Sequence, residues 1–202
     1  MKQNAQKRPS DGELLQQYCD GDEQAFRLLV DRYKNGLYGF LGRFLNHRAL
    51  VEDVFQETFV QLYISRESFD KSRPLRPWLF TIAANKAKDA LRKRQRTAAV
   101  QIGSIGAAEE MSFTDVLNVL SCQEKQPAEE LQKDEIAASV RRIIADMPEH
   151  LREILILAYF NKFSYKQMTE ILSIPIGTVK SRLHTAVGRF AREWKESVGT
   201  EK

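Results

Sequence analysis

Hydrophobic residues recur three and four positions apart along most of the first hundred residues, which is the spacing of one helical face. One such stretch starts after Asp22, a helix-capping residue, and ends at Asn46-His47. Another helix is predicted over about residues 50–64. A capping box at Ser10 and Glu13 predicts a short helix ahead of them. The N-terminal part of the chain therefore reads as a small helical unit.

The charged loop RESFDKSRPLRP separates this pattern from a further helix, in which Pro77 suits the first turn. That helix carries a predicted buried stripe of Trp78, Leu79, Ile82, Ala83, Ala90 and Leu91. In the C-terminal part, Pro148 opens a helix that Asn161 can close, since Asn tolerates a left-handed backbone. A short helix then stops at residues 173–175, and a last helix follows.

The segment between these parts, residues 97–133, loses the periodicity and contains the linker-like stretch QIGSIGAAEE. We find no strand pattern and no internal repeat. The sequence predicts an all-α protein of two small helical domains, residues 10–96 and 134–196, joined by a flexible acidic linker over 97–133. The second domain is predicted to contain a helix-turn-helix.

Charge is distributed unevenly along the chain, whose formal net charge is +4. Residues 1–96 carry 18 Lys or Arg and 12 Asp or Glu, whereas residues 97–133 carry 2 and 6. Residues 134–202 return to 11 bases and 9 acids. Basic ends around an acidic middle indicate two modules that face nucleic acid and a linker that does not.

Several protein classes find no support in the composition. No apolar run is long enough to span a membrane, and the polar start lacks a signal peptide, so we expect a cytoplasmic protein without membrane insertion. Cys19 and Cys122 lie far apart, which indicates neither a disulfide framework nor a zinc site. The histidines, His47, His150 and His184, are scattered, and no GxSxG or P-loop motif occurs. We therefore expect no enzyme activity, no metal and no cofactor.

The stretch IPIGTVKSRLHTA begins the second helix of a helix-turn-helix pattern. Its inward face is predicted to hold Val179, Leu183, Ala186, Val187 and Phe190. The residues left to contact DNA are Thr178 at the helix start, then Lys180, Ser181, Arg182, His184 and Thr185. Cations neutralise phosphates and can pair with guanine, and hydroxyl groups adapt to several partners. The alternative interpretation is a solvated face in an ordinary bundle.

A second basic helix lies at residues 78–94. Its stripe leaves Asn85, Lys88, Asp89, Arg92 and Lys93 pointing outward, and Lys86 adds charge. Phe69, Trp78 and Phe80 flank it, and aromatic rings beside cations can stack on unpaired bases. The alternatives are a helix that serves solubility or membrane contact, and plain core packing for Trp78 and Phe80.

Three segments in order resemble bacterial sigma factors: VEDVFQETFVQLY at 51–63, RPWLFTIAANKAKDALRKR at 76–94, and MPEHLREILILAYFNKFSYKQMTEILSIPIGTVKSRLHTAV at 147–187. Their order and spacing are similar to those of the smallest class, the extracytoplasmic-function sigma factors. The resemblance covers about residues 22–96 and 134–192. It implies a subunit that binds core RNA polymerase, directs it to promoters and helps to open the DNA.

The resemblance also implies roles for individual residues. Asp53, Gln56 and Glu57 match the family's polymerase-facing positions, although a solvated acidic face is the alternative from the residues alone. The loop 66–76 and the following helix would bind the minus-ten element and capture a base from the non-template strand, through Arg66, Phe69, Asn85, Lys86, Lys88, Asp89, Arg92 and Lys93. Lys180, Ser181, Arg182 and His184 would enter the minus-thirty-five major groove. An anti-sigma protein is an implied partner beside polymerase and promoter DNA.

The chain departs from the family's pattern at a few positions. The family often has glycine where Lys162 and Ser173 stand, in the two turns around the first helix of the helix-turn-helix. Ala84 stands where arginine is common. The runner-up function is a stand-alone helix-turn-helix regulator that binds duplex operator DNA, but it leaves residues 51–63 and 66–94 unexplained. A purely helical protein adaptor is disfavoured by the basic helices.

Overall fold

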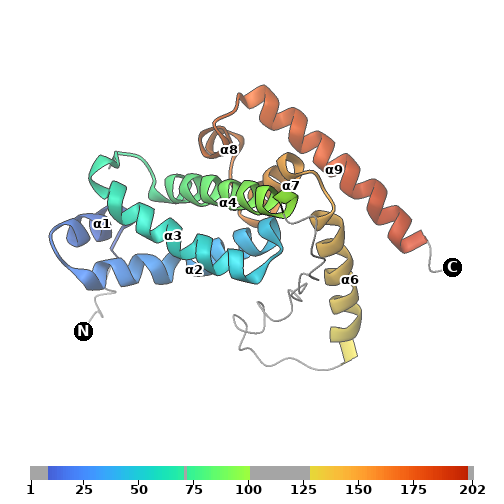
Figure 1. Ribbon diagram of the computed structural model, residues 1–202, viewed down its shortest axis with the longest axis horizontal. Helices are drawn as coiled ribbons and strands as arrows, with labels where there is room; N and C mark the ends of the chain where they lie inside the picture. Colours follow the sequence, from blue (N-terminus) through green and yellow to red (C-terminus); the bar gives the residue numbers. More distant parts are fainter. Residues whose placement is uncertain (1–8, 71, 101–127, 200–202) are drawn as a thin grey trace, which may run out of the picture.

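The computed structural model describes residues 9–70, 72–100 and 128–199, and all regular structure in these ranges is helical (Figure 1). The N-terminal domain contains α1 (Asp11–Cys19), α2 (Glu23–Leu45), α3 (Arg48–Ser65), the short turn η1 (Arg66–Ser68) and α4 (Leu75–Val100). The C-terminal domain contains α6 (Ala128–Ala145), α7 (Glu149–Leu155), the π-helical turn η2 (Ile156–Phe160), α8 (Tyr165–Leu172) and α9 (Ile176–Gly199). The predicted all-α class with two helical domains is confirmed.

Helices extend into both ends of the predicted linker, because α4 runs to Val100 and α6 begins at Ala128. The rest of that linker, residues 101–127, lies outside the described residues. Its predicted flexibility therefore stays a prediction. None of the described helices combines the length and the apolar character that a membrane crossing requires.

The predicted helix starts are confirmed by the capping contacts. The amide of Ser10 donates to Glu13 at 2.6 Å while the amide of Glu13 donates to the Ser10 hydroxyl at 3.3 Å. Asp22 caps α2 by accepting from the amide of Gln24 at 2.8 Å. At the other end of α2, Asn46 takes a left-handed backbone with φ 49°. These local contacts set the helix boundaries as the sequence predicts.

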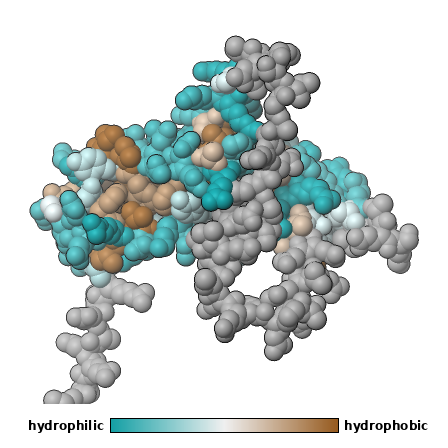
Figure 2. All heavy atoms as spheres, turned by 60° about the horizontal axis from the view of Figure 1, so that its bottom comes forward, coloured by the Kyte–Doolittle hydropathy of each residue, from teal (hydrophilic) through white to brown (hydrophobic). Residues whose placement is uncertain are grey.

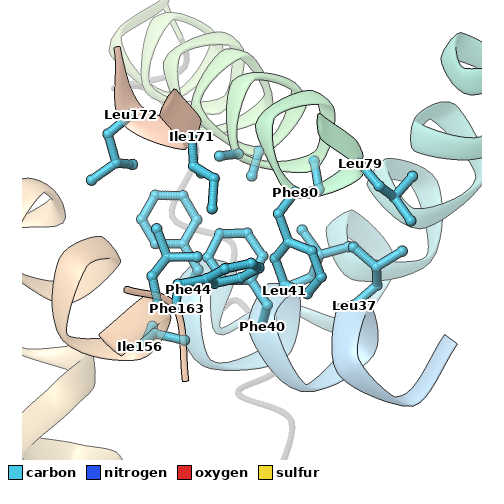
Figure 3. Close-up of a cluster of buried hydrophobic side chains, with 14 of the residues drawn as sticks. Leu37, Phe40, Leu41, Phe44, Leu79, Phe80, Ile156, Phe163, Ile171 and Leu172 are labelled. Atoms are coloured by element: carbon cyan, nitrogen blue, oxygen red, sulfur yellow. The ribbon is translucent and has the colours of Figure 1, made fainter. Parts of the chain in front are cut away.

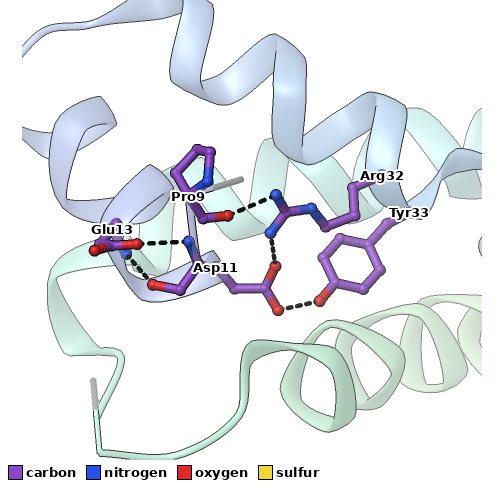
Figure 4. Close-up of polar contacts among 6 residues, drawn as sticks. Pro9, Asp11, Glu13, Arg32 and Tyr33 are labelled. Atoms are coloured by element: carbon purple, nitrogen blue, oxygen red, sulfur yellow. Dashed lines mark hydrogen bonds and ion pairs between the residues drawn. The ribbon is translucent and has the colours of Figure 1, made fainter. Parts of the chain in front are cut away.

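The first helix is tied to α2 by a polar cluster (Figure 4). Arg32 holds the Asp11 carboxylate at 2.5 Å and donates to the carbonyl of Pro9 at 2.7 Å. Tyr33 donates its hydroxyl to the other oxygen of Asp11. Burial of Tyr33, together with this hydrogen bond, raises the pKa of its phenol. The cluster fixes α1 as part of the N-terminal domain.

The two domains share one hydrophobic core rather than packing as separate bodies. Figure 3 shows Leu37, Phe40, Leu41, Phe44, Leu79 and Phe80 from α2 and α4 facing Ile156, Phe163, Ile171 and Leu172 from the C-terminal domain. The ring centre of Phe80 lies 5.6 Å from that of Phe40 in its own domain. The same ring lies 4.9 Å from Phe163 of the other domain. Helices α4 and α8 are in direct contact across this interface.

Polar contacts close the edges of the interface. Arg152 donates to the carbonyl of Phe44 at 2.9 Å, and the Asn161 amide donates to the carbonyl of Gly36 at 3.3 Å. Arg76 donates to the carbonyl of Asn161 at 2.5 Å. These bonds join α2 and α4 to the segment around η2 and satisfy backbone groups that the interface buries.

Three details of the sequence interpretation are wrong. Asn161 is not left-handed: a π-helical turn carries the helix on, with the amide of Asn161 bonded to the carbonyl of Ile156, and the left-handed residue is Lys162 with φ 57°. Val187, predicted to face inward, is 36% exposed. The predicted buried stripe of α4 left out three buried residues, which are Phe80, Ala84 and Ala87.

Candidate nucleic-acid interface

The helix-turn-helix is formed by α8 and α9. Ser164 and Gln167 make a reciprocal capping box at the start of α8. Ser173 ends α8 in a left-handed conformation with φ 53°, and the amide of Val179 bonds to the carbonyl of Pro175 as α9 begins. The tight turn between the two helices therefore depends on a residue type that rarely adopts this backbone.

The outer face of α9 holds the residues predicted to contact DNA. Val179, Leu183 and Ala186 are buried and fix the rotation of the helix. On the outside, Lys180, Ser181, His184 and Thr185 are exposed, whereas Thr178 and Arg182 are half-buried. The hydroxyl groups of Ser181 and Thr185 bond to backbone carbonyls one turn earlier, at 3.2 and 3.0 Å. All six residues lie on one helix, and its first turn includes Thr178.

Helix α4 presents part of its predicted set to solvent. Asn85, Asp89, Arg92 and Lys93 are exposed, and Arg92 pairs with Asp89 at 3.2 Å. An exposed pair of this kind contributes little to stability, so both groups can be redirected to another partner.

Two lysines of α4 form ion pairs with different helices. Lys86 lies 3.6 Å from Glu57 of α3, so a predicted minus-ten residue meets a predicted polymerase-facing residue. Lys88 lies 3.2 Å from Glu153 of α7, and its side chain is 20% exposed while that of Glu153 is 5% exposed. Burial raises the pKa of Glu153, and the Lys88 ammonium opposes that shift. Lys88 is thus turned toward the C-terminal domain and not toward solvent.

The loop that precedes α4 forms a polar hollow. Phe69, only 7% exposed, packs against Trp78 with ring centres 4.6 Å apart. Both rings line a cavity of about 380 Å³, together with Asp70 and Arg73 and with Glu170 of α8. The volume and the aromatic wall suit a planar group such as a nucleic-acid base. Phe80 is not part of this wall, because it is fully buried in the core, as the core-packing alternative held.

Arg66, another residue predicted for this loop, packs against the C-terminal end of α3. Its guanidinium lies 4.2 Å over the ring of Tyr63 and donates to the Tyr63 carbonyl at 2.7 Å. The Arg66 guanidinium also lies 3.7 Å from the carboxylate of Glu67. The side chain is 24% exposed, so it retains one open side.

The acidic face of α3 is exposed and continues into apolar residues. Asp53, Gln56 and Glu57 are exposed and line a shallow cavity of about 380 Å³ with Val60, Ile64, Gln61 and Lys86. Val60 is 57% exposed and Ile64 is 64% exposed. Positions 53, 57, 60 and 64 share one face of a helix. The sequence interpretation missed Val60 and Ile64, although apolar residues on a face otherwise polar were the available signal.

Further hydrophobic atoms gather at this end of the molecule (Figure 2). The large exposed apolar side chains of the N-terminal domain are Leu28, Val60, Tyr63 and Ile64. A contiguous apolar surface with a polar rim is typical of a protein-binding site.

Comparison with known proteins decides the family. The Sigma-70 region 2 model matches residues 29–97, and the Sigma-70 region 4 model matches residues 137–189. The ECF RNA polymerase sigma factor SigW of Bacillus subtilis is 30% identical over 172 residues, covering 84% of this chain and 89% of that protein. The chain belongs to the ECF family of RNA polymerase sigma factors. The resemblance described from the sequence is therefore confirmed.

Another relative agrees with this family, and two solved structures share the fold. The RNA polymerase sigma-H factor of Pseudomonas aeruginosa is 34% identical over 176 residues, covering 87% of this chain and 89% of that protein. The fold matches the sigma factor RpoE of Bartonella quintana, solved with the anti-sigma factor NepR, with a TM-score of 0.67 at 23% identity over 84% of this chain and 96% of that chain. It also matches CnrH, solved with the cytosolic domain of CnrY, with a TM-score of 0.64 at 22% identity over 96% and 100% of the chains.

As an ECF sigma factor, the protein is a transcription initiation factor that binds core RNA polymerase and promoter DNA. The stand-alone operator-binding regulator is not favoured, because both sigma regions are present in order. The surfaces on α3 and α4 lie within the matched region 2, and α8 with the part of α9 up to residue 189 lies within the matched region 4.

Proposed function

We propose that this sigma factor binds core polymerase through the outer face of α3. The set comprises Asp53, Gln56 and Glu57 with the apolar Val60 and Ile64. Its support is the combination of exposed carboxylates and exposed apolar side chains on one helix face, which the protein's own core leaves uncovered. Acidic residues beside apolar ones suit a partner surface that presents basic residues next to an apolar patch, because the charges then steer and orient the complex.

We further propose that α4 and the loop before it read the minus-ten element. The exposed strip of Asn85, Asp89, Arg92 and Lys93 would contact the strand, with Lys86 and Lys88 adding charge once they are freed from their partners. The cavity beside Phe69 and Arg66 would take a base drawn out of the stack. The aromatic wall and the cavity volume support this assignment.

The minus-thirty-five element is assigned to the outer face of α9. Lys180, Arg182 and His184 would supply base-edge and phosphate contacts, while Ser181 and Thr185 adapt to neighbouring acceptors. Thr178, in the first turn, lies where backbone amides can bind a phosphate. The proposed roles follow domains at 10–96 and 134–196, and α4 and α6 extend into the two ends of the segment 97–133 between them.

We also propose an anti-sigma protein as a regulatory partner, since one structure with a similar fold is solved with the anti-sigma factor NepR. The site of action is the cytoplasm, where polymerase and promoter DNA are found. We assign no covalent step to this chain. It would favour DNA opening by binding the melted strand.

Charge reversal on α3 tests the polymerase assignment. Asp53→Lys with Glu57→Lys is expected to weaken binding to core polymerase at least tenfold while the helical signal in circular dichroism is unchanged. Asp31→Lys is the control for a charge reversal on an exposed helix surface, because Asp31 is 64% exposed on α2, outside the α3 face. Normal affinity in the double variant would remove the assignment of this face.

A further inference from the structure

Arg182 is half-buried, unlike the exposed Lys180 and His184 on the same helix. Its surroundings follow from Arg189, which comes seven residues later and so lies on the same face of α9. Arg189 donates to the carbonyl of Asp146, just ahead of α7, at 3.4 Å. Helices α7 and α9 lie side by side (Figure 1). The face of α9 that carries Arg182 is therefore turned toward α7.

Helix α7 carries a buried carboxylate, Glu153, whose side chain is 5% exposed. Burial raises the pKa of this carboxyl group, and the charges of Lys88 and then of Arg182 oppose the rise. Two cations from different helices therefore act on one carboxylate. The ammonium of Lys88 lies 3.2 Å from Oε1, but this oxygen accepts no aligned hydrogen bond from the described residues. The carboxylate thus retains acceptor capacity that a guanidinium can use.

The position of Glu153 is unfavourable for stability. A buried carboxylate without an aligned hydrogen bond destabilises a fold, and a neutral amide of the same shape would avoid much of that cost. Lys88 offsets part of it, but Lys88 comes from α4 and is assigned above to the minus-ten element. Arg182 belongs to the same domain as Glu153. A buried group that costs stability is typical of a functional site, so Glu153 fits a role on Arg182 better than a role in the core.

We propose that Glu153 is a positioning residue for Arg182 in the reading of the minus-thirty-five element. The inference rests on the proposed function of α9. With the carboxylate as acceptor for one edge of the guanidinium, the other edge is presented to DNA, where O6 and N7 of a guanine accept a pair of hydrogen bonds. Holding the guanidinium in one orientation reduces the side-chain entropy that is lost on binding. Glu153 thereby contributes to base preference without contacting DNA.

Base preference, measured on the full chain with core polymerase, tests the positioning role. A template library randomised over the minus-ten and minus-thirty-five regions is transcribed with each variant, and the transcribed templates are sequenced. Arg182→Ala is expected to lower the guanine preference at one minus-thirty-five position roughly tenfold. Glu153→Gln is expected to lower the preference at the same position roughly threefold or more and to leave the minus-ten preferences unchanged.

Three variants control for a merely structural effect. Glu149→Gln is the matched control, since Glu149 lies one turn earlier on α7 and is half-buried, and it is expected to keep the full preference. Glu153→Gln combined with Arg182→Ala is expected to match Arg182→Ala alone, because Glu153 acts only through Arg182. Glu153→Asp keeps the charge and is expected to retain more of the preference than Glu153→Gln. Circular dichroism and co-elution with core polymerase check that each variant is folded.

The outcomes separate the positioning role from the function of α9. Unchanged preference in Glu153→Gln, or a loss spread evenly over all positions, overturns the positioning role. If Arg182→Ala still acts at one minus-thirty-five position, the function of α9 stands in that case. Equal losses in Glu153→Asp and Glu153→Gln also overturn the role of the charge. An Arg182→Ala variant without any position-specific loss contradicts the proposed function of α9 itself.

Discussion

Truncating the apolar residues on the outer face of α3 is expected to weaken polymerase binding without affecting folding. Fully burying a Val or Ile side chain is worth about 1.5–3 kcal/mol. Val60 is 57% exposed and Ile64 is 64% exposed, so more than half of each side chain is available to a partner. The double variant Val60→Ala with Ile64→Ala should therefore lose about 2 kcal/mol of binding free energy, or about 30-fold in Kd.

Titration of fluorescently labelled chain with sigma-free core polymerase measures this loss. Because both side chains are already exposed, the urea midpoint of the free chain should remain within experimental error of the parent. Ile136→Ala is the matched control, since Ile136 is 50% exposed on α6 of the other domain. Unchanged affinity in the double variant, or an equal loss in the control, would refute the reasoning that this face is covered by polymerase.

Three further predictions concern the C-terminal domain. Lys162→Gly and Ser173→Gly, at φ 57° and 53°, should each stabilise the fold by about 1 kcal/mol and raise Tm by a few degrees in calorimetry; a lower Tm would contradict backbone strain at these turns. Arg182→Ala should reduce run-off transcription about tenfold or more on promoters that depend on the minus-thirty-five element and spare those that rely on an extended minus-ten element, whereas equal loss on both would argue against the role of α9. The pKa of Glu153 is raised by burial, so its contribution to stability is fully present below the ordinary value of 4.5 and is lost as pH rises through the raised pKa. Glu153→Gln should accordingly gain stability relative to the parent between pH 5 and pH 8 in urea titrations, and a relative loss would mean that the ion pair with Lys88 dominates.

Helix ends could be predicted from the sequence because they depend on contacts between near neighbours. The contacts of the Ser10 capping box, the Asp22 cap and the left-handed Asn46 are all made with residues within four positions. The positions where the family often has glycine predicted turn geometry for the same reason, since Lys162 and Ser173 there take left-handed backbones. The helix ends at Asn161 as predicted, but its backbone conformation could not be predicted, because a π-helical turn precedes it and the left-handed conformation falls on Lys162.

The burial around α4 could not be predicted, because periodicity assigns one buried stripe to a helix, whereas α4 packs against α2, α3 and α8. One side packs on α3 and another on α8, which lies far away in sequence, so residues such as Ala84 are buried outside the predicted stripe. The same limit applies to the site. Exposed residues such as Asn85 and His184 lie as predicted, whereas the partners of Lys86 and Lys88 follow only from tertiary packing.

The most direct test of the central claim is reconstitution with sigma-free core RNA polymerase. The purified chain should co-elute with core polymerase on gel filtration, and the complex should start transcription at defined promoter sites on a genomic template, which core polymerase alone does not. A folded, helical chain that neither co-elutes nor directs initiation would contradict the account and leave duplex operator binding as the function to examine.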